Sequence, residues 1–169
     1  ANILPLAALL DFYEVAVAYA ESDERVRLIV KPKKPLDETL ASSPKLLARV
    51  RALGSAGRAA VLADVRTPLE AAFASDVALA LGVSSAGFLT ALAGVPTVFA
   101  DPTRAVDGPY GGMLADLGWM RGTTAFDSTA DALVAIAAWR ADHDGVSLGD
   151  LGAGARLVDP YGDGDSAAR

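Results

Sequence analysis

The fold of this chain is decided by residues 77–100, which read VALALGVSSAGFLTALAGVPTVFA and contain no charged residue. A run of this length without charges is long enough to cross a membrane. Its interior, however, carries glycines, serines and a proline where a strand–turn–helix–turn–strand unit needs its turns. We therefore predict a strand at 77–81, a helix at 85–93 and a strand at 97–100, with no transmembrane segment.

The same alternation extends along the rest of the chain. Short apolar runs predict further strands at 26–30, 59–63 and 123–126, and apolar residues at helical spacing predict helices at 1–20, 44–53, 110–117 and 129–140. Strands that alternate with helices are typical of an open, mostly parallel sheet flanked by helices. The predicted fold class is α/β, with one Rossmann-like sheet of about five to six strands in a single domain, residues 1–169.

Capping residues mark several of these helix starts. Thr67 and Glu70 have the spacing of a capping box, which predicts a short helix from residue 68. Ser128 is the expected N-cap of the helix at 129–140, and Ser43 that of the helix at 44–53, for which Gly54 is the expected stop.

The composition argues against several classes of function. With 21 acidic and 15 basic residues, the net charge of −6 disfavours binding to a nucleic-acid backbone, which needs a face rich in lysine and arginine. The absence of cysteine rules out disulfides, thiolate catalysis and cysteine-based metal sites. Residues 1–20 lack the basic start of a signal peptide, and we expect a cytoplasmic protein without a cofactor.

In open parallel sheets, ligands bind beyond the carboxyl ends of the strands, and the strand at 77–81 is followed there by a turn suited to an anion. Gly82 permits a tight reversal, and Ser84 and Ser85 begin a helix whose free amides and dipole favour a phosphate. Gly87 would allow a ligand to approach closely. The alternative is that Ser84 or Ser85 is an ordinary N-cap and the glycines only make the turn.

Other polar residues have a functional and a structural interpretation. Lys31, Lys33 and Lys34 follow the first strand and could attract a diphosphate, or they could form a solvated surface run. His143, the only histidine, lies between two aspartates at a helix end, where a cation suits the dipole but no hydroxyl nucleophile is adjacent. The acidic run at 159–165 lacks the spacing of a calcium loop, so we predict a turn there and no metal site.

Residues 75–96, SDVALALGVSSAGFLTALAGVP, resemble the nucleotide-sugar-binding half of GT-B glycosyltransferases and related nucleotide-sugar 2-epimerases. That family shows a strand, a serine-rich turn, a helix with a Glu-Ala pair, then a small residue and Gly-x-Pro. The basic segment after the first strand and the closing DPYGDGDSAAR resemble members that act in surface-polysaccharide biosynthesis.

The resemblance implies a binding site for a nucleotide-diphosphate sugar. The loop after the strand at 97–100, with Asp101 and Thr103, would lie near the nucleotide or sugar. The residues that the resemblance and the loop positions together assign to this ligand are Gly82, Val83, Ser84, Ser85, Ala86, Gly87, Lys31, Lys33, Asp101 and Thr103.

One departure from the family is Leu89, which occupies the position of a glutamate that hydrogen-bonds the ribose. Family members also have two Rossmann-like domains, and the first usually supplies the catalytic base. Because this chain starts without methionine and ends in a predicted helix, we expect the C-terminal half of a longer protein, with its catalytic residues unassigned.

Two functional hypotheses follow. The first is the donor-binding domain of a GT-B-like glycosyltransferase in glycoconjugate synthesis, which would bind the donor but not turn it over alone. The second is a non-catalytic Rossmann-like module that has lost nucleotide-sugar binding and acts through partner contacts, as Leu89 would favour.

Overall fold

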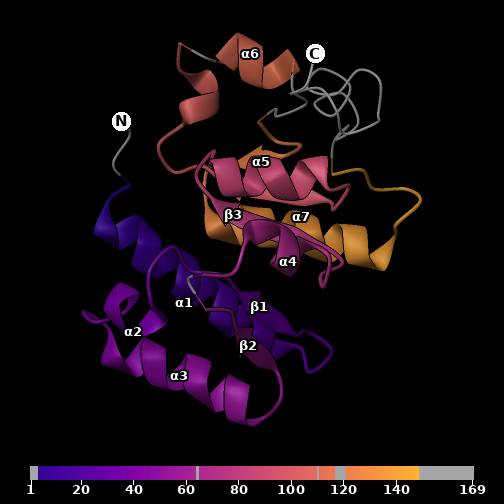
Figure 1. Ribbon diagram of the computed structural model, residues 1–169. Helices are drawn as coiled ribbons and strands as arrows, with labels where there is room; N and C mark the ends of the chain where they lie inside the picture. Colours follow the sequence, from indigo (N-terminus) through magenta and orange to yellow (C-terminus); the bar gives the residue numbers. More distant parts are fainter. Residues whose placement is uncertain (1–3, 64, 110, 117–120, 149–169) are drawn as a thin grey trace. The chain divides into compact units, whose positions relative to one another are not determined.

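The computed structural model describes residues 4–63, 65–109, 111–116 and 121–148 as an α/β protein (Figure 1). The chain divides between Ser75 and Asp76 into two compact units, each with its own parallel sheet. A single domain over residues 1–169 therefore stays a prediction.

The first unit is built around a parallel pair of strands. Its elements are α1 (Leu6–Ser22), β1 (Leu28–Val30), α2 (Leu36–Thr39), α3 (Pro44–Ser55), β2 (Ala59–Val61) and α4 (Pro68–Ala72). The register pairs Leu28 with Ala59 and Val30 with Val61. Parallel neighbours require a long crossover, which α2 and α3 provide here.

The core of the first unit lies between its helices and the strand pair. Tyr13, Val17 and Ala20 form a buried stripe on α1 because residues three and four apart share one helix face. They belong to one apolar cluster with Leu46 and Val50 of α3. Arg49 also joins α3 to α1 through ion pairs with two glutamates, Glu14 and Glu21.

The second unit is a three-stranded parallel sheet in the order β3-β4-β5. Its elements are β3 (Ala78–Leu81), α5 (Ser85–Leu92), β4 (Thr97–Ala100), the 3₁₀ turn η1 (Ala105–Asp107), α6 (Gly111–Asp116), β5 (Ala125–Phe126) and α7 (Thr129–Ala141). All four residues of the central strand β4 are buried, as expected for a parallel strand covered on both faces.

The longer predicted elements are confirmed, and several ends differ. The strand at 97–100 coincides with β4, and the helices at 85–93 and 129–140 correspond to α5 and α7. Ser43 occupies the N-cap position of α3 but makes no capping hydrogen bond with its side chain, and Gly54 lies inside that helix. Two short elements, α2 and η1, were not predicted.

The predicted sheet of five to six strands is not confirmed, because the described strands form separate sheets of two and three. Tyr110 and Leu117, the ends of one predicted helix, and the predicted turn and helix start after residue 158 lie outside the described residues. Within the described ranges, no helix combines the length and apolar character needed to cross a membrane.

Candidate functional site: the carboxyl edge of the β3-β4-β5 sheet

The predicted anion-binding turn lies at the carboxyl edge of the second unit's sheet. Gly82 follows β3 with φ of 66°, a left-handed conformation that glycine adopts without the steric cost of a side chain. Its N–H donates to the carbonyl of Ala100, the last residue of β4, at 2.6 Å. The Asp101 N–H donates in turn to Phe126 at the end of β5 at 2.7 Å. The segments after three neighbouring strands therefore begin at one edge.

Ser84 is the N-cap of α5 and its hydroxyl accepts a long hydrogen bond from the Gly87 N–H at 3.4 Å. The first backbone hydrogen bond of the helix runs from the Phe88 N–H to the Ser84 carbonyl at 3.0 Å. The amides of Ser85 and Ala86 precede it, so helix geometry provides them with no acceptor. Ser85 and Ala86 are both exposed residues.

Gly87 serves the packing of α5 on the sheet. It is buried, and a Cβ at this position would lie 2.9 Å from the Ala80 Cβ and still closer to the Phe99 ring. Such contacts are shorter than van der Waals packing allows, so α5 approaches β3 and β4 this closely only with glycine here. The missing side chain allows the helix and sheet to pack closely, and the close approach of a ligand at Gly87 stays a prediction.

The start of α5 differs from that of α7, which begins at the same edge after β5. In α7 the N-cap Ser128 donates to the Asp131 carboxylate at 2.7 Å, and the Asp131 N–H returns a hydrogen bond at 3.1 Å. The first turn of α5 contains no acidic residue. Because a carboxylate in the first turn already offsets the positive end of the dipole, α5 offers the better place for an external anion.

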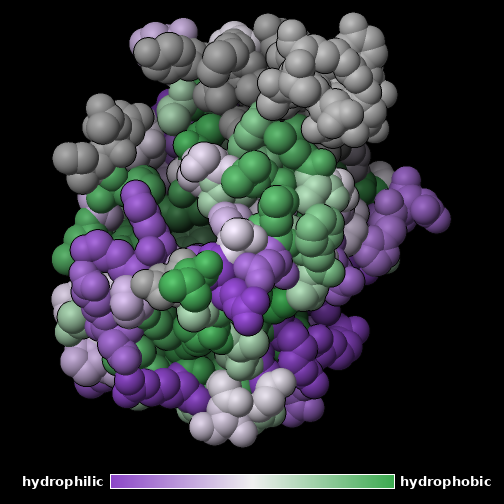
Figure 2. Space-filling model, in the orientation of Figure 1, coloured by the Kyte–Doolittle hydropathy of each residue, from purple (hydrophilic) through white to green (hydrophobic). Residues whose placement is uncertain are grey.

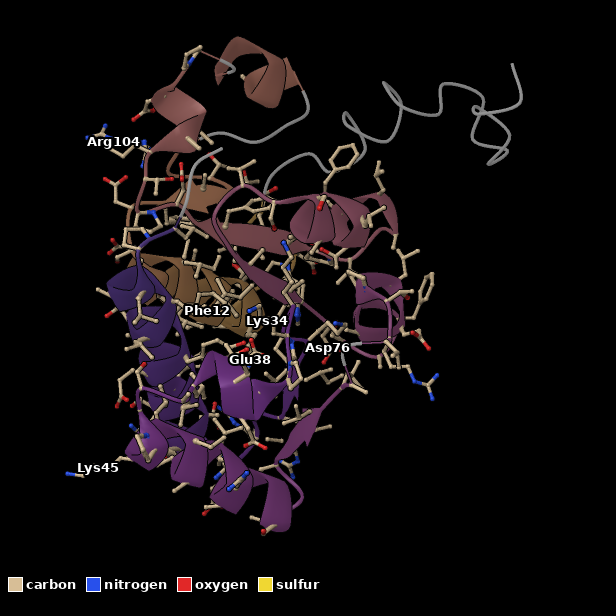
Figure 3. The ribbon with its side chains drawn as sticks, turned by 60° about the vertical axis from the view of Figure 1, so that its left-hand side comes forward. Phe12, Lys34, Glu38, Lys45, Asp76 and Arg104 are labelled. Carbon is tan, nitrogen blue, oxygen red and sulfur yellow. The ribbon has the colours of Figure 1, made fainter. Side chains whose placement is uncertain are left out.

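Asp101 is fully buried, and its carboxylate is engaged inside its own loop. It accepts hydrogen bonds from the N–H groups of Ala105 at 3.0 Å and Val106 at 3.1 Å, and from the Thr103 hydroxyl at 3.2 Å. This arrangement shapes the loop after β4 and uses both Asp101 and Thr103. Arg104 in the same loop adopts a left-handed backbone with φ of 55°, and its side chain points away from the ribbon (Figure 3).

Arginine and carboxylate side chains balance one another at this edge. Arg121 lies between three carboxylates: its Nη2 is 3.6 Å from Asp101, its Nε is 3.1 Å from Asp107, and it also pairs with Asp127. Hydrogen bonds from Arg121, and then from Arg104 at 2.8 Å, lower the pKa of Asp107 below its usual value. An anion at this edge would therefore depend mainly on amides and hydroxyls.

Asp101 is the only residue of this arginine–carboxylate network that the sequence predicts as a site residue. Asp127 could have been found, since it directly follows a predicted strand, as Asp101 does. Arg121 and Asp107 carry no comparable signal, because folding alone brings them to the strand ends.

Lys31 and Lys33, the two lysines predicted to bind the ligand, belong to the first unit. The Lys31 ammonium donates to the carbonyl of Pro32 at 2.7 Å, and Lys33 is exposed. Lys34 pairs with Glu38 at 2.6 Å, and the two side chains lie together in Figure 3. At least one cation of the run is thus matched by a carboxylate within the same unit.

His143 follows α7 and lines a hollow together with Pro96, the residue directly before β4. It therefore lies at the amino edge of the sheet, opposite the turn at Gly82. Its ring contacts Trp139 edge to face.

Comparison with known proteins identifies no relative: no family model, no curated protein and no solved structure matches this chain.

Proposed function

We propose that this chain is the donor-binding domain of a GT-B-like glycosyltransferase and that the turn at Gly82–Ser85 binds the diphosphate of a nucleotide sugar. The observation that carries the proposal is the start of α5. Ser85 and Ala86 are exposed residues whose amides lack helical acceptors, and the first turn of α5 contains no carboxylate that would offset its dipole.

The proposed role in transfer is electrostatic. As the sugar leaves, negative charge develops on the nucleotide diphosphate, and oriented amides and hydroxyls stabilise it without a metal or a covalent intermediate from this unit. Ser84 accepts one hydrogen bond as the N-cap, and its own hydroxyl proton stays available to a phosphate oxygen.

The wider proposal retains the sequence-based expectations. The chain would contribute one open Rossmann-like sheet of five to six strands, act in the cytoplasm and need a preceding Rossmann-like domain for turnover. The supporting observations are parallel βαβ units and a glycine turn at a strand's carboxyl end.

The test is a titration of the isotope-labelled chain with uridine diphosphate, guanosine diphosphate and inorganic pyrophosphate, followed by the amide signals of residues 84–87. We expect saturable shifts at millimolar concentrations and none with uridine, which has no phosphate. No shift at these amides with any of the three phosphate compounds would refute the proposal.

A matched pair of variants then locates the site. Ala86 and Ala130 are both exposed and both occupy the second helical position after a serine N-cap, in α5 and α7 respectively. Glutamate at either position suits the helix dipole, so both variants should fold. We expect Ala86→Glu to weaken diphosphate binding at least about tenfold, or about 1.4 kcal/mol, by charge repulsion, and Ala130→Glu to leave it unchanged. Equal affinities in the two variants would place the anion elsewhere.

A second candidate function is favoured by Leu89. This side chain is 38 % exposed on α5, and Figure 2 shows hydrophobic surface over that helix. A non-catalytic module would use this surface for a protein partner. This second function predicts that Leu89→Glu alters binding of the protein partner. It also predicts that diphosphate causes no amide shift in the wild-type chain.

A further inference from the structure

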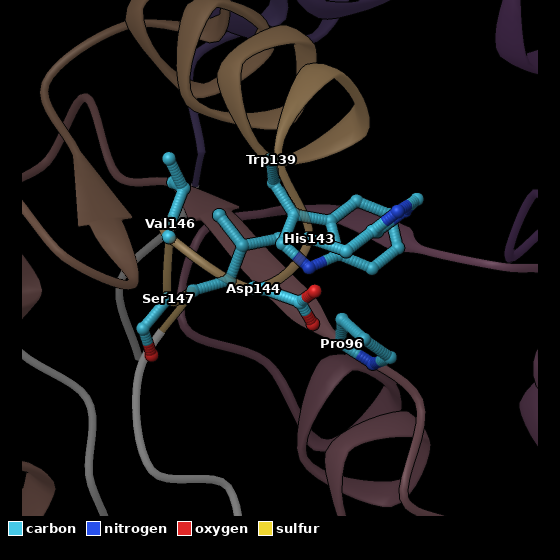
Figure 4. Close-up of a pocket in the computed structure, with 8 residues that line it drawn as sticks. Pro96, Trp139, His143, Asp144, Val146 and Ser147 are labelled. Carbon is cyan, nitrogen blue, oxygen red and sulfur yellow. The ribbon is translucent and has the colours of Figure 1, made fainter.

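A hollow of about 280 Å³ lies at the amino edge of the β3-β4-β5 sheet, away from the proposed diphosphate site (Figure 4). Its lining comes from the residue before β4, the last turn of α7 and the segment that follows α7. Ligand pockets usually measure roughly 300–1,000 Å³, so this hollow suits a single ring better than a whole nucleotide sugar.

The turn after α7 is held by Asp142. Its carboxylate accepts the Gly145 N–H at 2.8 Å, and its carbonyl accepts the Val146 N–H at 3.1 Å. A side chain at Gly145 would displace the Asp142 carboxylate from its present position, so glycine here keeps that hydrogen bond in place. Leu148 is 5 % exposed and anchors the far end of the segment. The wall that carries the polar groups of the hollow is therefore fixed at both ends.

An aromatic pair forms another wall. The rings of Trp139 and His143 meet edge to face, with their centroids 4.3 Å apart and an interplanar angle of 86°. This is a favourable geometry for aromatic rings, and it fixes the indole of a half-buried tryptophan beside Pro96. Trp139 contributes the π surface of an indole to the lining of the hollow, and Pro96 contributes an aliphatic ring.

The imidazole, carboxylate and hydroxyl groups of the lining come from the segment after α7. His143, Asp144 and Ser147 line the same hollow as the apolar side chains of Pro96 and Trp139. A pyranose has the complementary character, because its ring face is rich in C–H groups and its hydroxyls are hydrogen-bond donors that a carboxylate accepts. An anion would instead meet the negative charge of Asp144, so phosphates are disfavoured here.

We propose that this hollow binds one neutral sugar ring, stacked against Trp139 and hydrogen-bonded by the Asp144 carboxylate. The inference does not rest on the proposed diphosphate site. A ring of about a dozen non-hydrogen atoms at ordinary ligand efficiency corresponds to millimolar affinity, so the contact would recognise a residue of a larger saccharide.

The experiment follows the indole N–H signal of Trp139 in the full chain as methyl α-glucopyranoside is added, with Trp139→Phe identifying the signal. We expect a saturable shift with a millimolar dissociation constant. Asp144→Ala should weaken binding about tenfold, as expected for a lost hydrogen bond to a charged acceptor. Glu24→Ala, which removes an exposed carboxylate in the first unit, should leave binding unchanged.

Three results would overturn the inference. They are a Trp139 signal that does not respond to the sugar, an Asp144→Ala variant that is folded and binds like the wild type, and a stronger response to tetramethylammonium than to the sugar. The last result would identify a cation site. Loss of the diphosphate response in Ala86→Glu has no bearing on this hollow, so the two proposals fail independently.

Discussion

Replacing Gly87 by alanine tests how α5 is positioned on its sheet. The added methyl group would lie 2.9 Å from the Ala80 Cβ and closer still to Phe99, which has no exposed surface. Overpacking of this kind costs about 1–3 kcal/mol, whereas alanine gains up to about 1 kcal/mol in helix propensity over glycine. The expected net effect is a loss of about 1–2 kcal/mol in the free energy of unfolding, measured by urea denaturation.

Gly54→Ala is the matched control for that substitution. Gly54 lies in α3, and a Cβ there would meet only the Ala59 carbonyl at an ordinary 3.6 Å, so the helix-propensity gain should appear as increased stability. Combining Phe99→Leu with Gly87→Ala should cost less than the sum of the two single substitutions, because leucine is smaller and leaves room for the added methyl group. The reasoning is refuted if Gly87→Ala is as stable as Gly54→Ala, or if the Phe99→Leu and Gly87→Ala effects simply add.

Three further substitutions test the local interactions. Arg104→Asn should raise stability by up to about 1 kcal/mol, because asparagine tolerates φ of 55° better than arginine; a loss of stability in urea denaturation would contradict it. Thr67→Ala should cost about 1 kcal/mol by removing the cap that accepts the Glu70 N–H, and an unchanged thermal midpoint would argue against this. The hydrogen bond from Arg49 lowers the pKa of Glu21, so the pair stabilises the fold above the ordinary pKa of 4.5 and loses this contribution as pH falls through the lower folded value. Glu21→Gln should therefore reduce stability by less than about 1 kcal/mol at pH 7, with urea midpoints that converge with those of the wild type in acid; a difference that persists there would be inconsistent.

Local signals account for the parts of the fold that the sequence predicts. The capping box of Thr67 and Glu70 forms as expected because its partners lie three residues apart, and the Ser128 cap of α7 forms for the same reason. The strand at 97–100 was predictable because an apolar run between proline and aspartate has few alternatives. The four residues of α2 are too few to show a periodic pattern, so their helix could not be predicted.

The candidate site is only partly visible in the sequence, because its residues interact across the fold. A polar residue after a strand is predictable at position 101, but the orientation of its carboxylate is not. Asp101 turns into its own loop because the N–H groups of Ala105 and Val106 need an acceptor in a buried place. Gly87 illustrates the same limit, since a glycine needed for helix packing and one needed for ligand access look alike until Phe99 is located.

The two edges of the β3-β4-β5 sheet offer different groups to the two proposed ligands. The carboxyl edge includes the start of α5, where the first amides have no acceptor within the helix, whereas the hollow at the amino edge combines Trp139 with the Asp144 carboxylate. A four-residue strand such as β4 spans roughly 13 Å, which exceeds the width of one sugar ring. A diphosphate at one edge and a pyranose at the other would thus be bound by different groups, without a shared contact. Saturating one edge with its ligand should leave the affinity of the other edge for its own ligand unchanged. Coupling would require a ligand to favour one of two states of the intervening structure, such as two positions of the buried strand β4.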